Sequence, residues 1–477
     1  LCSCVNVKEP DDETITTNAA ATDTVVDTEN PFDQNGFLKD NLPADINLGG
    51  RVVTTLYWSD VEHEEFKSET LSGDLVNDAI FSRNSKVEER LSIELEYIGR
   101  PGNVNNLSSF SEYAKSNILA GTNEFDIIAS YSRTTAYLAA NNFTENLFDF
   151  DNLDFSKPWW PEDLTRTATI KNRLLFCSGD ISANMLYMMY VTFFNKSLLN
   201  QYSLENPYEL VEKNEWTIDK MLSMTQGAYV DLNTNQKKDA ADQFGLIDTN
   251  RNLDALFVGS GLITVEKDEN DLPVISPLFG SEKTQNLVTK ICTAYYNTND
   301  CFYNNDAKAA LESYGAGKGI FIVERSRLSF SRLTPSGIDY GIVPVPKYDT
   351  EQTSYITHIG FPYTIYAIPT GLGDPENVAS VLECLASESY RQVTPAVFEL
   401  SMKIKYSNDD ISAKMFDIAR ETVSFDLGIL YCTSLNNLTF SLFRNSIISG
   451  SGNFTVSYNA SSKMLDNLLN KLVTGFN

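Results

Sequence analysis

Aromatic and charged residues follow several apolar segments that we expect to form strands. In open α/β sheets, ligands bind beyond the carboxyl ends of the strands, where loops and helix starts meet. Flat aromatic faces suit the C–H groups of a sugar ring, and charged side chains suit its hydroxyl groups. The candidate ligand contacts selected by this rule are Trp58, Asp60, Tyr131, Arg133, Asp180, Glu324 and Arg325.

A second candidate site is the oxygen-rich segment 231–242, which fits the calcium-binding loop of EF-hands at several positions. Calcium prefers oxygen ligands, and their alternating spacing lets one loop wrap the ion. Gln236 replaces the usual glycine and Asp242 the usual bidentate glutamate, so an Asn/Asp-rich turn held by its own hydrogen bonds is the alternative. The predicted ligands of a structural Ca²⁺ are Asp231, Asn233, Asn235, the Lys237 carbonyl, Asp239 and Asp242.

Other chemistry is poorly represented. The chain has only two histidines, His63 and His358, and it lacks the G-x-S-x-G, P-loop and H-E-x-x-H motifs. None of its seven cysteines forms a C-x-x-C pair, which excludes common zinc and redox sites. Cys292 and Cys301 are close enough in sequence to pair, although most of the cysteines are expected to be free, structural thiols. We expect no catalytic residues and no cofactor other than calcium.

A secreted glycoside hydrolase is the alternative function. Such enzymes need two carboxylates on either side of one bond, and acidic residues are abundant here. Because acidic residues are so abundant, the sequence alone gives no evidence that two of them lie on either side of a scissile bond. The cluster of Glu62, Glu64 and Glu65 around His63 is read as a solvent-exposed face rather than a site.

The elements that must position these residues alternate along the chain. Strands are predicted at 52–58, 93–98 and 125–129, with helices at 73–90 and 113–119 between them. This alternation is typical of a parallel α/β sheet. After Trp160 the pattern returns, with a strand at 174–177, an apolar segment at 186–194 and helices near Leu198 and at 217–224. Later strands are expected at 319–323 and 340–343, and later helices at 376–388, 410–422 and 461–473.

Length and charge limit the classes that remain. A chain of 477 residues is too long for one hydrophobic core, so two lobes are expected. Its formal net charge of −27 repels phosphates and anionic lipid, which argues against nucleic acid as a partner. No uninterrupted apolar run approaches the roughly 20 residues that span a bilayer.

The first 49 residues have a different character. Leu1-Cys2-Ser3-Cys4 resembles the end of a bacterial lipoprotein signal peptide, with Cys4 as the lipidated residue, so residues 1–4 are interpreted as a lipobox remnant. Residues 5–49 contain ten acidic and two basic residues and no apolar periodicity. Such a segment buries too little surface to offset its ordering entropy, and it is predicted to be a disordered acidic tether.

Several blocks of the body resemble the carbohydrate-type extracellular solute-binding proteins of bacterial ABC importers. The blocks are Phe193-Phe194-Asn195-Lys196-Ser197-Leu198-Leu199, then Asn206-Pro207-Tyr208-Glu209-Leu210 and Glu215-Trp216-Thr217-Ile218-Asp219-Lys220, then 317–322, and 339–348. Thr217 can cap the following helix and Trp216 can pack against its flank. The resemblance covers roughly residues 50–477.

The resemblance implies a periplasmic-binding-protein-like fold of two α/β lobes, with a hinge and a ligand cleft between them. It assigns residues 50–160 and 300–348 to the first lobe, and residues 161–299 and 349–477 to the second. It adds the aromatic residues Phe257, Phe361 and Tyr363 to the candidate ligand contacts. It further implies a monomeric lipoprotein, anchored at the extracellular face of the cell membrane, that binds a carbohydrate and delivers it to a membrane permease.

Overall fold

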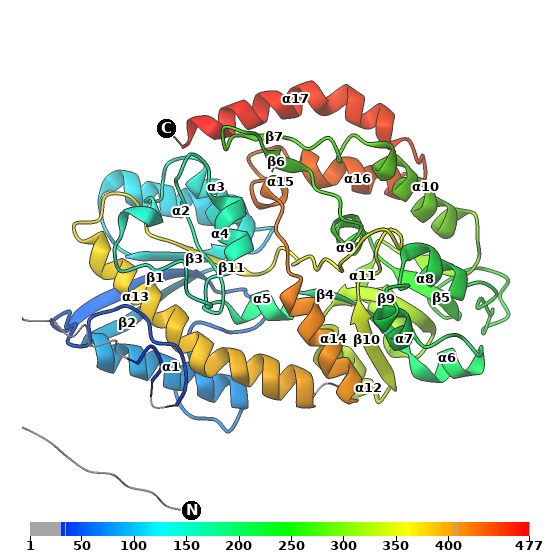
Figure 1. Ribbon diagram of the computed structural model, residues 1–477, viewed down its shortest axis with the longest axis horizontal. Helices are drawn as coiled ribbons and strands as arrows, with labels where there is room; N and C mark the ends of the chain where they lie inside the picture. Colours follow the sequence, from blue (N-terminus) through cyan, green and yellow to red (C-terminus); the bar gives the residue numbers. More distant parts are fainter. Residues whose placement is uncertain (1–29, 34, 406, 408, 477) are drawn as a thin grey trace, which may run out of the picture. The chain divides into compact units, whose positions relative to one another are not determined.

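The strand segments rich in β-branched and aromatic residues form two separate sheets in the computed structural model, which describes residues 30–33, 35–405, 407 and 409–476. By its contacts the chain divides into two units, residues 1–39 and 40–477. The helices and strands found among the described residues all belong to the second unit. Figure 1 shows the two larger sheets side by side within it, with helices covering them.

The first sheet has four strands in the order β11-β3-β1-β2. β1 (Arg51–Trp58) pairs in parallel with β2 (Ile93–Arg100) and β3 (Ile127–Tyr131), and β11 (Thr364–Ala367) runs antiparallel to β3. The carboxyl ends of the three parallel strands therefore share one edge. Helices α1 (Leu75–Leu91), α2 (Leu107–Ala120) and α3 (Ser132–Ala139) follow these strands in sequence, and the predicted strand–helix alternation is confirmed.

The second sheet has five strands in the order β10-β4-β9-β5-β8. Its strands are β4 (Tyr190–Asn195), β5 (Phe244–Asp248), β8 (Cys301–Tyr303), β9 (Gly319–Arg325) and β10 (Tyr340–Pro344). Every residue of β4, β5, β9 and β10 is buried, which explains their continuous apolar character. Trp216 is fully buried and donates its indole N–H to the Pro344 carbonyl, while the Thr217 hydroxyl accepts from the Lys220 amide and caps α8, as predicted.

The remaining elements cover or connect the sheets. In the second lobe they are α6 (Lys196–Gln201), α7 (Pro207–Glu212), α8 (Ile218–Met224), α9 (Leu253–Gly259), α10 (Glu282–Tyr296), α11 (Ala307–Gly315), the hairpin β6 (Val265–Lys267) and β7 (Pro273–Ile275), and α12 (Thr334–Ser336). Between the sheets and at the end of the chain they are η1 (Leu147–Asp149), α4 (Glu162–Ala168), α5 (Ala183–Tyr187), η2 (Ser329–Leu333), α13 (Pro375–Glu388), η3 (Ser389–Val393), η4 (Pro395–Lys405), α14 (Asp410–Glu421), α15 (Leu427–Leu430), α16 (Leu438–Ile448) and α17 (Phe454–Thr474).

The lobe boundaries expected from the resemblance are wrong in three places. The segment 300–348, assigned to the first lobe, supplies β8, β9 and β10 of the second sheet. Residues 364–388, assigned to the second lobe, supply β11 of the first sheet and α13, which packs against α1. Apolar strands of this kind fit either sheet by composition, so tertiary pairing decides their place.

The predicted strand at 174–177 also belongs with the first sheet. Its only ladder contact among the described residues is an isolated antiparallel bridge between Cys177 and Tyr366 of β11. The chain passes to the second sheet after this point, reaching β4 at Tyr190. The second lobe therefore begins later than residue 161.

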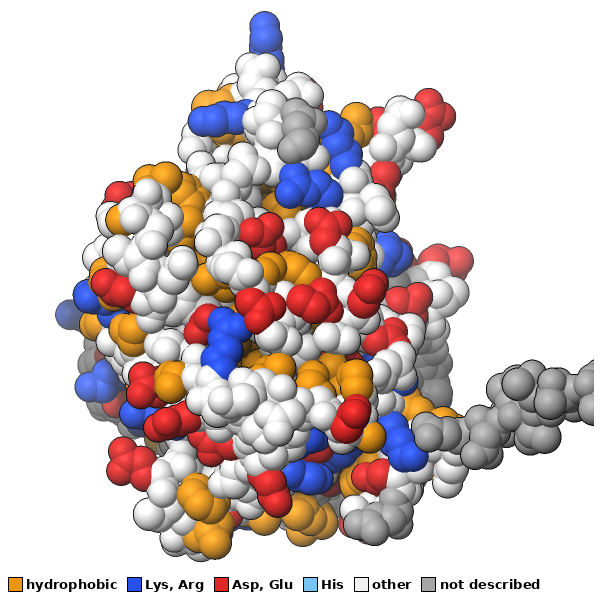
Figure 2. All heavy atoms as spheres, turned by 90° about the vertical axis from the view of Figure 1, so that its left-hand side faces the viewer, with side chains coloured by type: hydrophobic (Ala, Val, Ile, Leu, Met, Phe, Trp, Pro, Cys, Tyr) orange, Lys and Arg blue, Asp and Glu red, His pale blue; other side chains and the backbone are white. Residues whose placement is uncertain are grey.

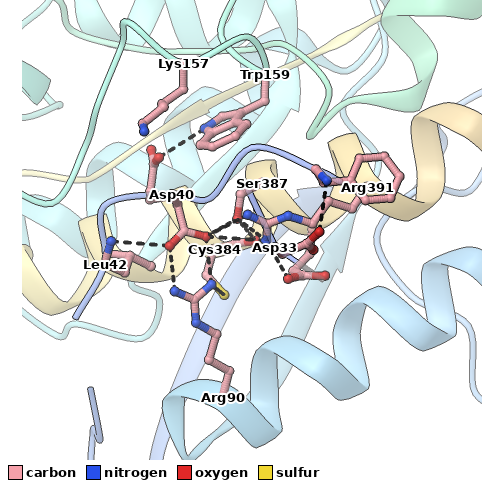
Figure 3. Close-up of polar contacts among 12 residues, drawn as sticks. Asp33, Asp40, Leu42, Arg90, Lys157, Trp159, Cys384, Ser387 and Arg391 are labelled. Atoms are coloured by element: carbon pink, nitrogen blue, oxygen red, sulfur yellow. Dashed lines mark hydrogen bonds and ion pairs between the residues drawn. The ribbon is translucent and has the colours of Figure 1, made fainter. Parts of the chain in front are cut away.

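An ion-pair network fixes the start of the second unit to the first lobe (Figure 3). The Asp40 carboxylate accepts hydrogen bonds from Arg90 of α1 at 2.5 and 2.7 Å and from the Ser387 hydroxyl of α13 at 2.8 Å. Arg391 pairs with both Asp40 and Glu388, and Lys86 pairs with Glu388 at 2.9 Å. Burial opposes the charge of Asp40, but Arg90 outweighs it and lowers the pKa of the carboxyl to about 2.

This network corrects the predicted tether. Asp40 and Leu42 are buried, so the part of residues 5–49 from Asp40 onward is packed rather than disordered. Residues 1–29, which include the predicted lipidation site Cys4, lie outside the described residues. The five described cysteines are all free thiols, Cys292 and Cys301 included. Among the described residues, no helix combines the length and apolar character that crossing a bilayer requires.

Candidate ligand-binding site

A cavity of about 300 Å³ lies where the strand ends of the two sheets face each other. From the first lobe it is lined by the last residues of β1 and β3, by residues that follow β1, β2 and β3, and by the loop before β11. From the other side it is lined by the start of β4, the end of β9, the loop after β5, α9, and α16, which packs against α9 and α10 of the second lobe. Six of the predicted contacts line it: Trp58, Asp60, Tyr131, Arg133, Arg325 and Phe361.

Trp58 and Tyr131 form the aromatic base of the first-lobe wall. Their ring centroids are 5.5 Å apart at 52°, and the Trp58 indole N–H donates to the Thr364 hydroxyl at 2.8 Å. Both side chains are almost wholly buried, with exposed fractions of 1% and 4%. Burial raises the pKa of the Tyr131 hydroxyl to about 12, so it is a neutral hydrogen-bonding group at pH 7.

Asp60 has a mainly structural role in this wall. Its carboxylate accepts hydrogen bonds from the backbone amides of Gly102 and Asn103, at 2.7 and 3.0 Å, and from the Asn106 side chain at 3.1 Å. It thereby holds the turn between β2 and α2, which presents Asn103, Val104 and Asn105 to the cavity. The prediction that Asp60 contacts the ligand stays a prediction.

The second-lobe wall contains Arg325 at the end of β9. Its Nε lies 2.9 Å from Glu324 Oε1, and its Nη1 lies 3.3 Å from Glu62 Oε1. Glu62 also pairs with Arg327. Beside them Tyr190 stacks on His358, with ring centroids 5.7 Å apart. Burial lowers the pKa of His358 to about 4, so this imidazole is neutral at pH 7.

The third part of the lining combines charged side chains with aromatic rings. Asp254 of α9 binds Arg444 of α16 through both carboxylate oxygens, at 2.7 Å for the bond from Nε. Two guanidinium groups lie over the Phe440 ring, with Cζ of Arg444 at 4.6 Å and Cζ of Arg133 at 5.5 Å from its centroid. Arg133 also lies over the Phe361 ring, at 5.3 Å.

Four predicted contacts do not line the cavity. Asp180 pairs with Arg420 of α14 at 3.4 Å, and burial raises its pKa to about 6. Phe257 packs in the core against Phe279 and Phe443. Buried Glu324 lies behind the wall, where it orients Arg325. Tyr363 is buried beside Phe425.

Several lining residues were not predicted from the sequence. Arg251 and Asp254 follow β5, a strand that was not predicted, although the apolar run 244–247 was a usable signal. His358 precedes β11, an antiparallel strand, so the rule for carboxyl ends could not select it. Phe440 and Arg444 lie on α16, and no local pattern marks them. The remaining missed side chains of the lining are Glu62, Asn103, Val104, Asn105, Tyr190 and Pro362.

The acidic cluster around His63 is not one solvated face. Glu65 is fully buried and accepts from the Asn184 amide at 2.8 Å and from the hydroxyl of Thr364. These bonds tie the loop after β1 to α5 and β11. Glu64 is exposed and caps the Phe66 amide, and Glu62 lines the cavity.

The loop 231–242 closes on itself through hydrogen bonds. The Asp239 carboxylate accepts from the Asn235 amide at 2.8 Å, and Asp231 accepts from the Gln236 backbone N–H at 2.8 Å. Gln236 adopts φ +59° at the position where an EF-hand has glycine. The described residues hold no group of three or more His, Cys, Asp or Glu side chains placed for a metal. Amide and carbonyl oxygens would therefore have to complete the coordination, and calcium binding stays a prediction.

Solved structures of sugar-binding proteins share this architecture. The chain superposes on the cyclic α-maltosyl-1,6-maltose-binding protein of Arthrobacter globiformis with a TM-score of 0.60 and 14% identity, covering 88% of this chain and 99% of that one. The maltose-binding periplasmic protein of Listeria monocytogenes, in complex with maltose, gives 0.58 and 13%, with 88% and 98% covered. A cyclo/maltodextrin-binding protein complexed with maltotetraose gives 0.57 and 10%, with 89% and 96% covered.

No sequence-family model matches the chain, and no curated protein sequence matches it. The fold is therefore the basis for comparing this chain with known proteins. The chain has the two-domain fold of maltose-binding proteins and resembles the carbohydrate solute-binding proteins. The predicted two-lobe α/β fold is confirmed, and the hinge between the lobes stays a prediction.

Proposed function

We propose that this protein is an extracellular solute-binding protein that captures a saccharide in the cavity between its two lobes. The observation that carries the proposal is the composition of the lining. Aromatic faces from both lobes, Phe361 and Phe440, lie beside guanidinium and amide groups. Such a set matches the alternation of C–H faces and hydroxyl groups on a sugar ring.

Capture follows from the way the lining is divided between the lobes. A ligand that contacts Tyr131 and Arg133 on one side and Tyr190 and Arg325 on the other gains more contacts when the lobes approach each other. It therefore stabilises a closed arrangement by its differential affinity. We propose that a membrane permease of an ABC importer recognises this closed form. We also propose a lipid anchor at Cys4, which keeps the protein at the extracellular face of the membrane.

Binding without turnover is part of the proposal. Each carboxylate that lines the cavity is already engaged with protein groups: Asp60 with backbone amides, Glu62 with Arg325 and Arg327, and Asp254 with Arg444. A glycosidase needs one carboxyl to donate a proton and another to attack or to activate water. Hydrolysis of any glycan by the purified protein would contradict the proposal.

The test is a thermal-shift screen of mono- and oligosaccharides, followed by calorimetry on the hits. A ligand that binds only the native state raises the melting temperature. Phe440→Ala removes a half-buried ring from the cavity, and we expect it to weaken binding at least about tenfold while the protein stays folded. Phe148→Ala, an exposed aromatic outside the cavity, is the matched control. Equal affinity in both variants would place the binding site elsewhere.

A further inference from the structure

The cavity concentrates positive charge in a chain that is otherwise strongly acidic. The sequence has 37 basic and 64 acidic residues, and Figure 2 shows Asp and Glu side chains distributed over the face drawn. The cavity lining reverses this balance, with four arginines against three carboxylates. The arginines are Arg133, Arg251, Arg325 and Arg444.

The carboxylates of the lining neutralise only two of these arginines. Asp254 is bound to Arg444, and Glu62 is bound to Arg325, which also has Glu324 behind it. Asp60 is held by the turn at 102–106. Within the described part of the chain, neither Arg133 nor Arg251 forms an ion pair.

Arg133 is nevertheless held in place. Its Nη2 donates to Asn437 Oδ1 at 2.5 Å and its Nε to the Thr433 hydroxyl at 3.4 Å, and its plane lies over Phe361 and Phe440. All of these partners are neutral. The side chain is thus oriented without being neutralised, and a preoriented guanidinium loses less entropy when it binds an anion.

Arg251 reaches the cavity from the opposite lobe, in the loop between β5 and α9. Its backbone is fixed by the Tyr190 hydroxyl, which donates to the Arg251 carbonyl at 3.1 Å. Its side chain is exposed. Two unpaired cations therefore face the cavity, one from each lobe.

A neutral sugar does not need guanidinium groups without a carboxylate partner, because amides, hydroxyls and neutralised guanidinium groups satisfy its hydroxyl groups. A guanidinium forms its strongest, bidentate bonds with carboxylate and with sulfate-like oxyanions. The field of a chain with net charge −27 also repels anions at long range, so local cations are required for any anionic ligand to bind.

We infer that the ligand is an acidic saccharide, whose carboxylate or sulfate group is bound by Arg133 and Arg251. This inference rests on the proposed function and narrows its substrate class. Because arginines of both lobes would bind the same anionic group, the charge of the ligand would also favour the closed arrangement of the lobes.

The experiment compares matched saccharides by calorimetry on the full chain: uronic acid oligosaccharides, sulfated oligosaccharides, and neutral counterparts of the same length and linkage. We expect at least about tenfold tighter binding of one acidic series, with affinity that falls as salt rises. The series that binds shows whether the anionic group is a carboxylate or a sulfate.

The variants Arg133→Gln and Arg251→Gln test whether these two arginines cause the preference for acidic saccharides. Each should lower the affinity for the acidic series much more than the affinity for the neutral series, and so remove most of the acidic preference. Arg166→Gln, an exposed arginine outside the cavity, should keep the preference. Equal binding of neutral and acidic series, or a preference that survives both cavity variants, would overturn the inference and leave the proposed function standing. Binding of no saccharide in either series would overturn both.

Discussion

Two clusters of charged residues in this molecule are built in opposite ways. Around Asp40, the cations have carboxylate partners: Arg90 and Arg391 pair with Asp40 (Figure 3). Arg391 and Lys86 also pair with Glu388. In the cavity, Arg325 and Arg444 have such partners, Arg133 has neutral ones, and Arg251 forms no ion pair among the described residues. The first cluster joins parts of the fold and leaves no cation for a ligand. The second has charge that a ligand can still neutralise.

The largest effect on stability is expected from removing Asp40, the carboxylate that Arg90 and Arg391 share. Asp40→Ala leaves Arg90 and Arg391 without their shared carboxylate, and removing one partner of a buried pair is costly. We expect the free energy of unfolding to fall by about 3 kcal/mol, with saccharide affinity unchanged. Urea unfolding and calorimetry measure the two quantities. Asp45→Ala, at an exposed position of the same segment, should change stability by no more than about 0.5 kcal/mol. A loss of affinity in Asp40→Ala would mean that the two clusters are coupled.

Glu383 is a buried carboxyl close to the same cluster, and its titration should make stability depend on pH. It accepts from the indole N–H groups of Trp159 and Trp160, at 3.1 and 2.8 Å, and burial raises its pKa from 4.5 to about 8. Because the folded-state pKa is the higher one, its contribution to stability is fully present below pH 4.5 and is lost as pH rises through about 8.

Glu383→Gln removes this titration but also costs one indole hydrogen bond. At pH 5 we expect the variant to be less stable than the wild type by about 1 kcal/mol. At pH 9 the difference should shrink or reverse, because the wild type then carries a buried charge. Urea unfolding at the two pH values measures this, and a pH-independent difference would contradict the assignment.

Asp254→Asn tests the cavity cluster by removing the carboxylate that pairs with Arg444. The substitution keeps the shape of the side chain but releases Arg444 from its ion pair, so the cavity gains a third cation without a partner. We expect the ratio of acidic to neutral saccharide affinity to rise about threefold, and stability to fall because Arg444 is largely buried. Calorimetry on the matched saccharides measures the ratio. No change in it would show that Arg444 does not face the bound anion.

The smallest effect is expected at the loop 231–242, where the carboxylates accept from amides and, at Asp242, also from the Tyr229 hydroxyl. We predict that calcium raises the melting temperature by about 1–2 °C and that a chelator reverses this. Asp231→Asn should abolish the shift, since it removes a charged ligand at the first loop position. Magnesium at the same concentration is the control for ionic strength. A melting temperature that ignores calcium would show that the hydrogen bonds alone complete this loop.

Several elements could be predicted because their signals are local. The strand at 51–58 follows from a β-branched and aromatic run, and the Thr217 cap follows from the residues of its own helix. Trp58, Tyr131, Arg133 and Arg325 could be selected because they end strands or follow them. Phe257 and Tyr363 were misplaced because an aromatic side chain in a core and one in a cavity look the same in sequence.

The amino-acid sequence by itself determined the strand–helix alternation, the acidic character and the strand-end residues from which the cavity wall is partly built. Only the tertiary structure decided that β8, β9 and β10 join the second sheet and β11 the first. It also decided that Phe440 and Arg444 lie beside Arg133, and which arginines keep a carboxylate partner. Hydrophobic patterns and caps act over a few residues, whereas sheet partners and ion pairs depend on long-range packing that no local pattern encodes.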